Sequence, residues 1–176
     1  IKLYRKQKIS LALMNFMMDL HAERGYKEIL PPQLINPASM TGTGQLPKFQ
    51  EDAFWCERDD LYLAPTAEVP VTNMYADEVL PMNELPYKYT AYSACFRREA
   101  GSYRADERGM VRGHQFNKVE MVQYTKPEHS DAAFEELVEK AERLVKDLGF
   151  HFRTVKLAAG DCSASMARTY DIEIQI

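Results

Sequence analysis

Residues 95–122 read CFRREAGSYRADERGMVRGHQFNKVEMV, and this stretch decides the fold. It joins two segments, residues 87–96 and 114–124, in which aromatic or apolar side chains alternate with small or polar ones, a pattern that predicts two long strands. Residues 100–111 between them are rich in glycine and charge, which is typical of a flexible loop. Because neighbouring strands joined directly are most simply antiparallel, we expect a long hairpin.

Helices and shorter strands are expected on both sides of this hairpin in the sequence. The clearest helix has an apolar stripe at helical spacing between Asp131 and Leu148. The predicted helices cover residues 8–24, 67–75 and 131–148, the predicted short strands residues 26–30, 62–64 and 152–157, and a predicted loop residues 37–49. This order favours an α+β fold, in which helices flank a mixed, mainly antiparallel sheet, over a doubly wound parallel sheet.

The composition of the chain is that of an ordinary soluble globular domain, because 45% of its 176 residues are hydrophobic and 27% are charged. No apolar run approaches the roughly 20 residues that cross a bilayer, so no membrane contact is expected. The formal net charge is −4, and no basic patch is evident. Since phosphate neutralisation dominates binding to nucleic acid, any RNA would have to be held mainly by other parts of a longer protein.

Cysteine and histidine usage indicates the compartment and the metal chemistry. Cys56, Cys95 and Cys162 lie far apart without a CxxC pair, which fits a reducing compartment, and we expect the cytoplasm. The four histidines show no metal-ligand spacing, so no protein-bound metal is expected. The chain opens at Ile1 and ends inside an alternating apolar stretch, so both ends are expected to be the limits of a fragment.

The predicted hairpin gathers chemically useful side chains on one face. Residues of equal parity on a strand share a face, so Arg97 and Glu99 are expected to project together, and Arg112, Phe116 and Glu120 to line the return strand. Arginine forks bind phosphate or carboxylate, an aromatic ring stacks on a purine, and a carboxylate accepts from an ammonium or an adenine amino group. This set suits a nucleoside triphosphate and an amino acid.

An exposed hairpin whose charges only pair with one another is the alternative interpretation, since strand periodicity alone does not require a ligand. Two arginines of the connecting loop, Arg104 and Arg108, would be able to fold over phosphates. Neither a GxGxxG stretch nor a P-loop is present, so the standard nucleotide-binding folds are not indicated.

The segment 96–101 (FRREAG), followed by HQF and KVEM at 114–121, resembles the second signature motif of the class II aminoacyl-tRNA synthetases in its seryl form. Four more segments resemble the same family, in the expected order. They are GYKEILPP (25–32) for the first motif, with Pro32 as its proline, TGTGQLPKF (41–49) for the loop after it, PTAEVPVTN (65–73) for the serine-binding segment, and RTYDIEI (168–174) for the strand leading toward the third motif. The implied fold is an antiparallel sheet flanked by helices.

The resemblance implies a role for each matching position of the hairpin. Arg97 would hold the ATP α-phosphate and the serine carboxylate, Glu99 would accept from the adenine amino group, and Phe116 would stack on adenine. Arg112 would reach the outer phosphates, and Glu120 would bind serine through its ammonium or hydroxyl. Arg97 and Glu120 are therefore the expected catalytic residues.

The serine pocket would be completed by Thr66, Ala67 and Glu68, with Ala67 keeping it small; Thr66 is also a plausible helix N-cap. Arg98 belongs to the same ATP-binding segment, but it stands where the family commonly has serine. Its projection opposite Arg97 indicates a structural or interface role. Arg104 is displaced by one position from the family pattern, which leaves its role open.

The implied reaction is activation of L-serine with ATP and Mg²⁺ to seryl-adenylate, and transfer of the seryl group to tRNA(Ser). Residues 1–176 would be a partial catalytic domain with the first and second motifs but without the third motif or the N-terminal tRNA-binding helical arm, and would be inactive or weakly active alone. A homodimer through the first motif around Pro32 is expected. The alternatives are a ligase that loads a carrier protein and a non-catalytic paralogue.

Overall fold

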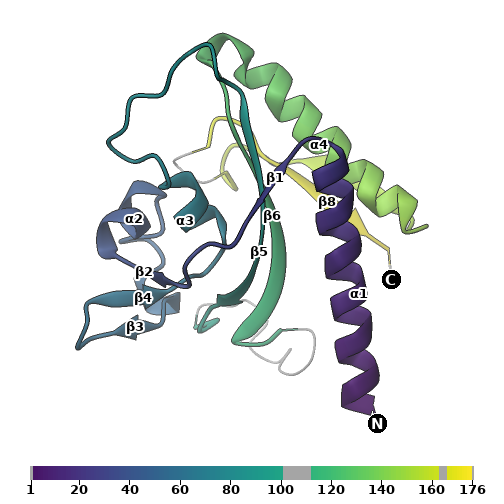
Figure 1. Cartoon of the computed structure of the whole chain (residues 1–176). Helices are drawn as coiled ribbons and strands as arrows, with labels where there is room; N and C mark the ends of the chain where they lie inside the picture. The colour runs from purple at the N-terminus through teal and green to yellow at the C-terminus, as the bar shows by residue number, and fades with distance from the viewer. Residues whose placement is uncertain (1, 101–111, 163–165, 176) are drawn as a thin grey trace. The chain divides into compact units, whose positions relative to one another are not determined.

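The computed structural model describes residues 2–100, 112–162 and 166–175. The chain divides into two compact units, residues 1–124 and 125–176. The helices are α1 (Lys2–Glu23), α2 (Pro37–Gly42), α3 (Glu68–Thr72) and α4 (Ser130–Asp147), and the strands are β1 (Lys27–Ile29), β2 (Leu34–Ile35), β3 (Trp55–Cys56), β4 (Leu61–Leu63), β5 (Tyr87–Phe96), β6 (Gln115–Tyr124), β7 (Phe152–Lys156) and β8 (Tyr170–Ile174) (Figure 1).

The predicted hairpin forms the centre of the first unit. Strands β5 and β6 pair antiparallel from Tyr87 opposite Tyr124 to Phe96 opposite Gln115, and β5 has the predicted bounds. Strand β1 lies parallel to the other edge of β5, so the sheet order is β1-β5-β6. The sheet is therefore mixed, as expected.

Helices α1 and α3 lie on opposite sides of this hairpin (Figure 1). On the α1 side, the Thr90 hydroxyl contacts the Met18 sulfur at 3.7 Å. On the α3 side, a buried cluster of Ala67, Val71 and the sheet residues Tyr89 and Ala91 joins the helix to the strands. The two faces of the strands thus have different partners, and only the α3 face carries the predicted site.

Residues 37–49 were expected to form a loop, but residues 37–42 form α2. The Asn36 side chain accepts a hydrogen bond from the Ser39 backbone N–H at 2.8 Å, and Pro37 occupies the start of the helix. An Asn N-cap followed by proline is a helix-start signal that outweighs the Thr-Gly composition of the segment. The loop prediction was therefore wrong for these six residues.

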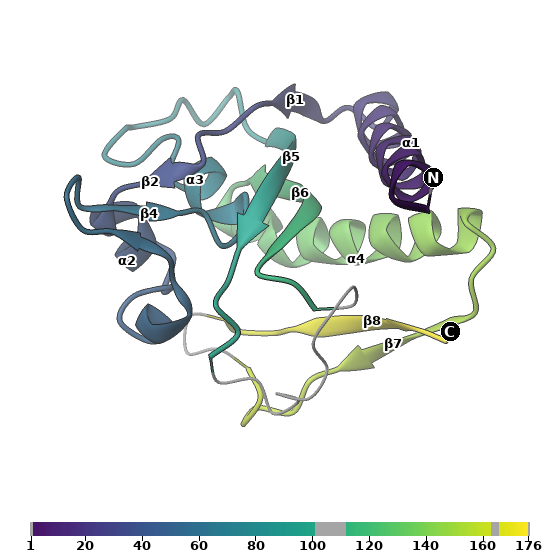
Figure 2. The same ribbon diagram turned by 90° about the horizontal axis from the view of Figure 1, so that it is seen from below.

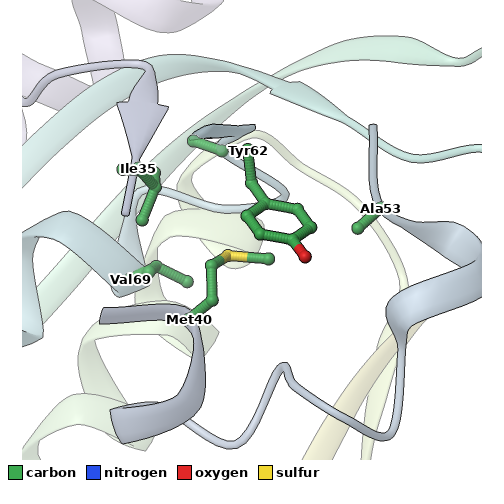
Figure 3. Packing of buried hydrophobic residues seen from close by; sticks show 6 residues of the cluster. Ile35, Met40, Ala53, Tyr62 and Val69 are labelled. Carbon is green, nitrogen blue, oxygen red and sulfur yellow. The ribbon is translucent and has the colours of Figure 1, made fainter. Parts of the chain in front are cut away.

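A second small sheet, in the order β2-β4-β3, stands beside α2. Its buried cluster contains Ile35, Met40, Ala53, Tyr62, Ala64 and Val69. In Figure 3 the Met40 side chain is directed toward the Tyr62 ring, and Ile35 and Val69 lie beside them. This cluster fixes two segments that border the candidate site, residues 52–54 and 64–68.

The second unit consists of α4 and the antiparallel strands β7 and β8 (Figure 2). Arg168 lies over the Phe134 ring at 4.7 Å and pairs with Glu135 at 2.9 Å, and the Phe134 and Tyr170 rings stack with centroids 5.6 Å apart. The predicted helix 131–148 and strand 152–157 are confirmed to within a residue. Among the described residues, no helix is both long and apolar enough to cross a membrane.

Candidate functional site

The floor of the candidate site is the α3 face of the β5–β6 hairpin. Residues directly opposite each other in an antiparallel pair share a face. Phe116, Lys118 and Glu120 of β6 lie opposite Cys95, Ser93 and Ala91 of β5. These three β5 residues are small and buried, so the larger side chains of β6 have room to extend over them.

Glu120 is held by Thr66, which lies far from it in the sequence. The Thr66 hydroxyl donates to Glu120 Oε2 at 2.9 Å, and its oxygen accepts from the Glu68 backbone N–H at 3.2 Å. Thr66 is only 2% exposed. The hydroxyl therefore contacts both the Glu120 carboxylate and the backbone at the start of α3. The N-cap position of α3 is Ala67, so the N-cap prediction for Thr66 was wrong by one residue.

The residues after Thr66 differ in where they point. Ala67 is fully buried in the cluster with Val71 and Tyr89, so its side chain faces the core. Glu68 is half-buried, and burial raises the pKa of its carboxyl group above the ordinary value. The negative charge of Glu120 raises that pKa further, while Lys118 and Arg97 lower it. Glu68 and Glu120 therefore form a pair of carboxylates compensated by two cations.

Arg97 extends the same face beyond the end of β5. Its backbone N–H donates to the His114 carbonyl at 2.9 Å, so the pairing of the two chains continues past the strands. The Arg97 Nε donates to the Pro65 carbonyl at 3.3 Å, and the guanidinium lies 5.3 Å from the centre of the Phe116 ring. Arg97 is exposed, so its remaining guanidinium nitrogens face solvent and are available to an anion.

Glu99 and Arg112 come together where the chain leaves and re-enters the hairpin. Arg112 Nη1 lies 3.2 Å from Glu99 Oε2. Glu99 has a φ of +54°, which is uncommon for a residue other than glycine and turns the chain out of the strand direction. Neither residue lies within a strand, so their pairing comes from the turn geometry and not from strand parity.

The segment 97–100 is anchored to the segment that precedes β3. Asp52 accepts from two backbone N–H groups, from Arg98 through its carbonyl at 2.8 Å and from Ala100 through its side chain at 2.7 Å. The Arg98 Nε donates to the Ala53 carbonyl at 3.0 Å, and its guanidinium lies 4.6 Å from the centre of the Phe54 ring. Arg98 thus has structural partners, as its departure from the motif suggested. Arg104 and Arg108 lie outside the described residues.

A cavity of about 110 Å³ adjoins Arg97 and Glu99. The segment TGTGQLPKF contributes Gln45 and Phe49 to its wall, and Pro65 contributes from the segment PTAEVPVTN. Motif segments separated by tens of residues therefore border one hollow. Within the described residues, no three histidine, cysteine, aspartate or glutamate side chains lie close enough together to hold a metal ion.

The comparison with protein families matches residues 54–176 to the model described as tRNA synthetase class II core domain (G, H, P, S and T). The chain belongs to this family. Among curated relatives, serine–tRNA ligases from Geobacillus sp. (strain WCH70) and Prochlorococcus marinus (strain MIT 9303) are 58% and 52% identical over 95% of the chain. The chain spans 40% and 39% of their lengths, so it corresponds to less than half of either relative.

Solved structures of class II synthetases agree with the family assignment. A seryl-tRNA synthetase from Pyrococcus horikoshii complexed with ATP superposes with a TM-score of 0.90 at 38% identity, over 94% of this chain and 37% of that one. A cytoplasmic serine–tRNA ligase from Naegleria fowleri in complex with AMP gives a TM-score of 0.88 at 32% identity, over 94% and 39%. The predicted class II fold and the resemblance to seryl-tRNA synthetases are confirmed.

Lys118 is the residue of this class II site that the sequence analysis missed. Its ammonium lies 2.6 Å from Glu120 Oε2, within the face that also carries Phe116. Lys118 has the parity of Phe116 and Glu120, so strand periodicity would have included it. Only the contact itself shows that it shares an oxygen with Thr66.

Proposed function

We propose that residues 1–176 form the part of a serine–tRNA ligase catalytic domain that carries the first and second signature motifs. The ligase activates L-serine with ATP and transfers the seryl group to tRNA(Ser). The observation that carries this proposal is the convergence of Glu120, Thr66 and Arg97 on one face of the hairpin. Its similarity to curated serine–tRNA ligases supports the choice of amino acid.

The serine subsite centres on Glu120. One of its carboxylate oxygens is bound by Thr66, and the carboxylate as a whole carries a charge suited to the serine ammonium. Glu68, half-buried beside it, offers a second acceptor for the ammonium or the hydroxyl. The side chain of Ala67 faces the core and not this subsite, so Ala67 would not set the size of the subsite through its side chain.

The small subsite favours serine over alanine and over larger amino acids. A pocket that hydrogen-bonds the substrate hydroxyl rejects alanine, because the polar groups of the pocket would be left unpaired by it. Larger side chains are rejected by volume. Specificity for serine thus follows from the carboxylates and the Thr66 hydroxyl together.

The ATP subsite extends from Arg97 toward the turn that holds Glu99 and Arg112. Arg97 has exposed guanidinium nitrogens for the α-phosphate and for the serine carboxylate. Phe116 provides a ring for the adenine, and Glu99 an acceptor for its amino group. Arg112 is 46% exposed beyond its contact with Glu99 and is placed to meet the outer phosphates. The terminal nitrogens of Arg98 would add to the positive field, while its Nε remains on Ala53.

Magnesium would enter this subsite on the phosphates of ATP. Mg²⁺ is usually held by substrate phosphates, waters and one or two carboxylates, and not by a cage of protein ligands. Glu99 and Glu120 would offer carboxylate oxygens to such an ion. When bound, the ion would neutralise phosphate charge.

The chemistry then needs positioning more than covalent help. A serine carboxylate oxygen attacks the α-phosphorus of ATP, the bond from that phosphorus to pyrophosphate breaks, and seryl-adenylate forms. A hydroxyl of the terminal adenosine of tRNA(Ser) then attacks the seryl carbonyl, and AMP leaves. Arg97 lowers the repulsion between two anions in the first step, which is a main source of acceleration in phosphoryl chemistry.

The proposed ligase is a cytoplasmic homodimer that joins through its first motif. Helix α1 exposes a row of apolar side chains at helical spacing, Ile9, Leu13 and Phe16. Leu11 on another face of α1 and Leu30 after β1 are exposed as well. Exposed apolar rows of this kind commonly mark protein interfaces. Pro32 follows Leu30 by two residues and is itself exposed.

The function is tested by ATP–pyrophosphate exchange with a panel of amino acids, run on the full-length product of the gene. Serine alone should support exchange. Glu120→Ala should abolish it, and Arg97→Ala should lower it at least about a hundredfold, because each removes a charged contact to the reacting groups. Glu139→Ala, an exposed position on α4, is the matched control and should retain wild-type exchange. Exchange with another amino acid, or full exchange by Glu120→Ala, would refute the proposal.

A further inference from the structure

Lys118 occupies a place in the site that the proposed roles do not explain. It lies on β6 between Phe116 and Glu120 on the same face, opposite Ser93. Its side chain is 33% exposed and that of Glu120 is 22% exposed, so their contact is partly shielded from water. Such a contact is stronger than an ion pair on an open surface, where the contribution is small.

The two oxygens of the Glu120 carboxylate have different surroundings. Oε2 receives both the Thr66 hydroxyl at 2.9 Å and the Lys118 ammonium at 2.6 Å. No side chain of the described residues bonds to Oε1. Thr66 and Lys118 therefore both approach the carboxylate at Oε2.

The charges around Glu120 balance. Glu68 and Glu120 supply two negative charges, and Lys118 and Arg97 supply two positive charges that both act on Glu68. A free amino acid is a zwitterion and adds no net charge, so this group of four residues accepts it without a change in balance. A plain amine would add a positive charge that only a pocket with an excess of carboxylate would favour.

We propose that Lys118 is a positioning residue that holds Glu120 through Oε2, so that Oε1 receives the ammonium of the amino acid. The charge of Lys118 also makes the pocket select a zwitterion over an amine that has no carboxylate. This inference rests on the proposed function, because it assigns the amino acid to the Glu120 subsite. Lys118 would select the charge of the ligand, whereas the other residues of the pocket select its size and its hydroxyl group.

Removal of the Lys118 charge should weaken the binding of serine more than the binding of an amine without a carboxylate. Lys118→Met leaves two carboxylates facing one guanidinium, so the pocket gains an excess negative charge. L-serine should bind more weakly, because its carboxylate meets that charge and Glu120 is no longer oriented. Ethanolamine, which has the ammonium and hydroxyl of serine but no carboxylate, should lose much less or gain. Lys118→Arg keeps the charge and should behave like the wild type.

The test measures the dissociation constants of L-serine and ethanolamine by calorimetry on the full-length gene product. In Lys118→Met, the preference for serine over ethanolamine should fall by about tenfold or more, the size expected for loss of a partly shielded charged contact. Lys118→Arg should restore most of the preference. Lys118→Gln serves as a second neutral variant if Lys118→Met does not fold.

Each outcome separates this inference from the proposed function. If both ligands weaken by the same factor in the neutral variants, Lys118 only supports the fold and the inference is overturned. If the wild type binds serine and the preference does not change, the inference fails while the proposed function stands. If the wild type binds no serine, the proposed function fails, and the inference fails with it.

Discussion

At the scale of single residues, Glu68 of the proposed serine subsite lowers the stability of the fold at neutral pH. Burial raises the pKa of its carboxyl group above 4.5, and the neighbouring Glu120 adds to this effect. The folded protein therefore holds the Glu68 proton more tightly than the unfolded chain does. It follows that the contribution of Glu68 to stability is unfavourable at neutral pH and improves as the pH falls through the raised pKa toward 4.5.

Glu68→Gln should accordingly raise the melting temperature at about pH 7, since it removes a charge that is costly to bury. The gain should shrink as the pH is lowered toward 4.5, where wild-type Glu68 itself takes up a proton. Thermal melts of both proteins across this range measure the difference. The same variant should bind serine more weakly, because an acceptor of the proposed subsite loses its charge.

The control for this measurement is Glu57→Gln, which changes an exposed carboxylate outside the site and should leave the melting temperature unchanged. A lower melting temperature of Glu68→Gln at neutral pH would mean that Lys118 and Arg97 stabilise the Glu68 charge by more than burial penalises it.

At the scale of elements, the position of α3 on the sheet decides where Thr66 and Glu68 lie. The Tyr124 hydroxyl at the end of β6 donates to the Val71 carbonyl of α3. Burial raises the pKa of Tyr124 to about 12, with a further contribution from Tyr75, so this hydroxyl stays protonated as a donor at every ordinary pH. The bond joins the helix of the proposed serine subsite to the strand that carries Glu120.

Tyr124→Phe should lower the free energy of unfolding by about 1 kcal/mol, the usual contribution of one hydrogen bond. A larger loss is not expected, because the Val71 carbonyl also accepts from the Met74 backbone N–H at 3.2 Å and keeps a partner. Urea unfolding of the variant measures the change. Tyr92→Phe is the comparison variant, since Tyr92 belongs to the opposite face of β5, and it should change stability by much less.

At the scale of the whole molecule, the exposed Leu30 of the first motif predicts association. Leu30 is 87% exposed, so Leu30→Asp should fold as well as the wild type. In a symmetric dimer the substitution would place two unpaired carboxylates in the contact. The dissociation constant of the dimer should rise on the order of a hundredfold, because burial of an unpaired charge is strongly unfavourable.

Sedimentation velocity of the full-length gene product measures this change. Val79→Asp substitutes a side chain that is 97% exposed outside the first motif, and it should leave the dimer intact. A wild-type protein that stays monomeric at micromolar concentration, or a Leu30→Asp variant that remains dimeric, would contradict the proposed interface.

Strand periodicity in the sequence was sufficient to determine the hairpin and the face it presents. Alternation along residues 87–96 and 114–124 fixes which side chains point the same way, because the side-chain period of a strand is two. The shared face of Phe116 and Glu120 follows from this alone, and the register of the hairpin places Arg97 on the same side. Helix α4 was likewise predictable, since its apolar stripe is a local pattern.

The tertiary structure alone decided what covers that face. Thr66 reaches Glu120 across 54 residues, and Asp52 anchors the chain at Ala100 across 48, distances over which periodicity carries no information. Two other features are not predicted by the sequence pattern. They are the parallel pairing of β1 with β5 and the contact of both Thr66 and Lys118 with one Glu120 oxygen. A local sequence pattern determines the direction in which a side chain points. Which residue that side chain contacts depends on the packing of segments that are distant in the sequence.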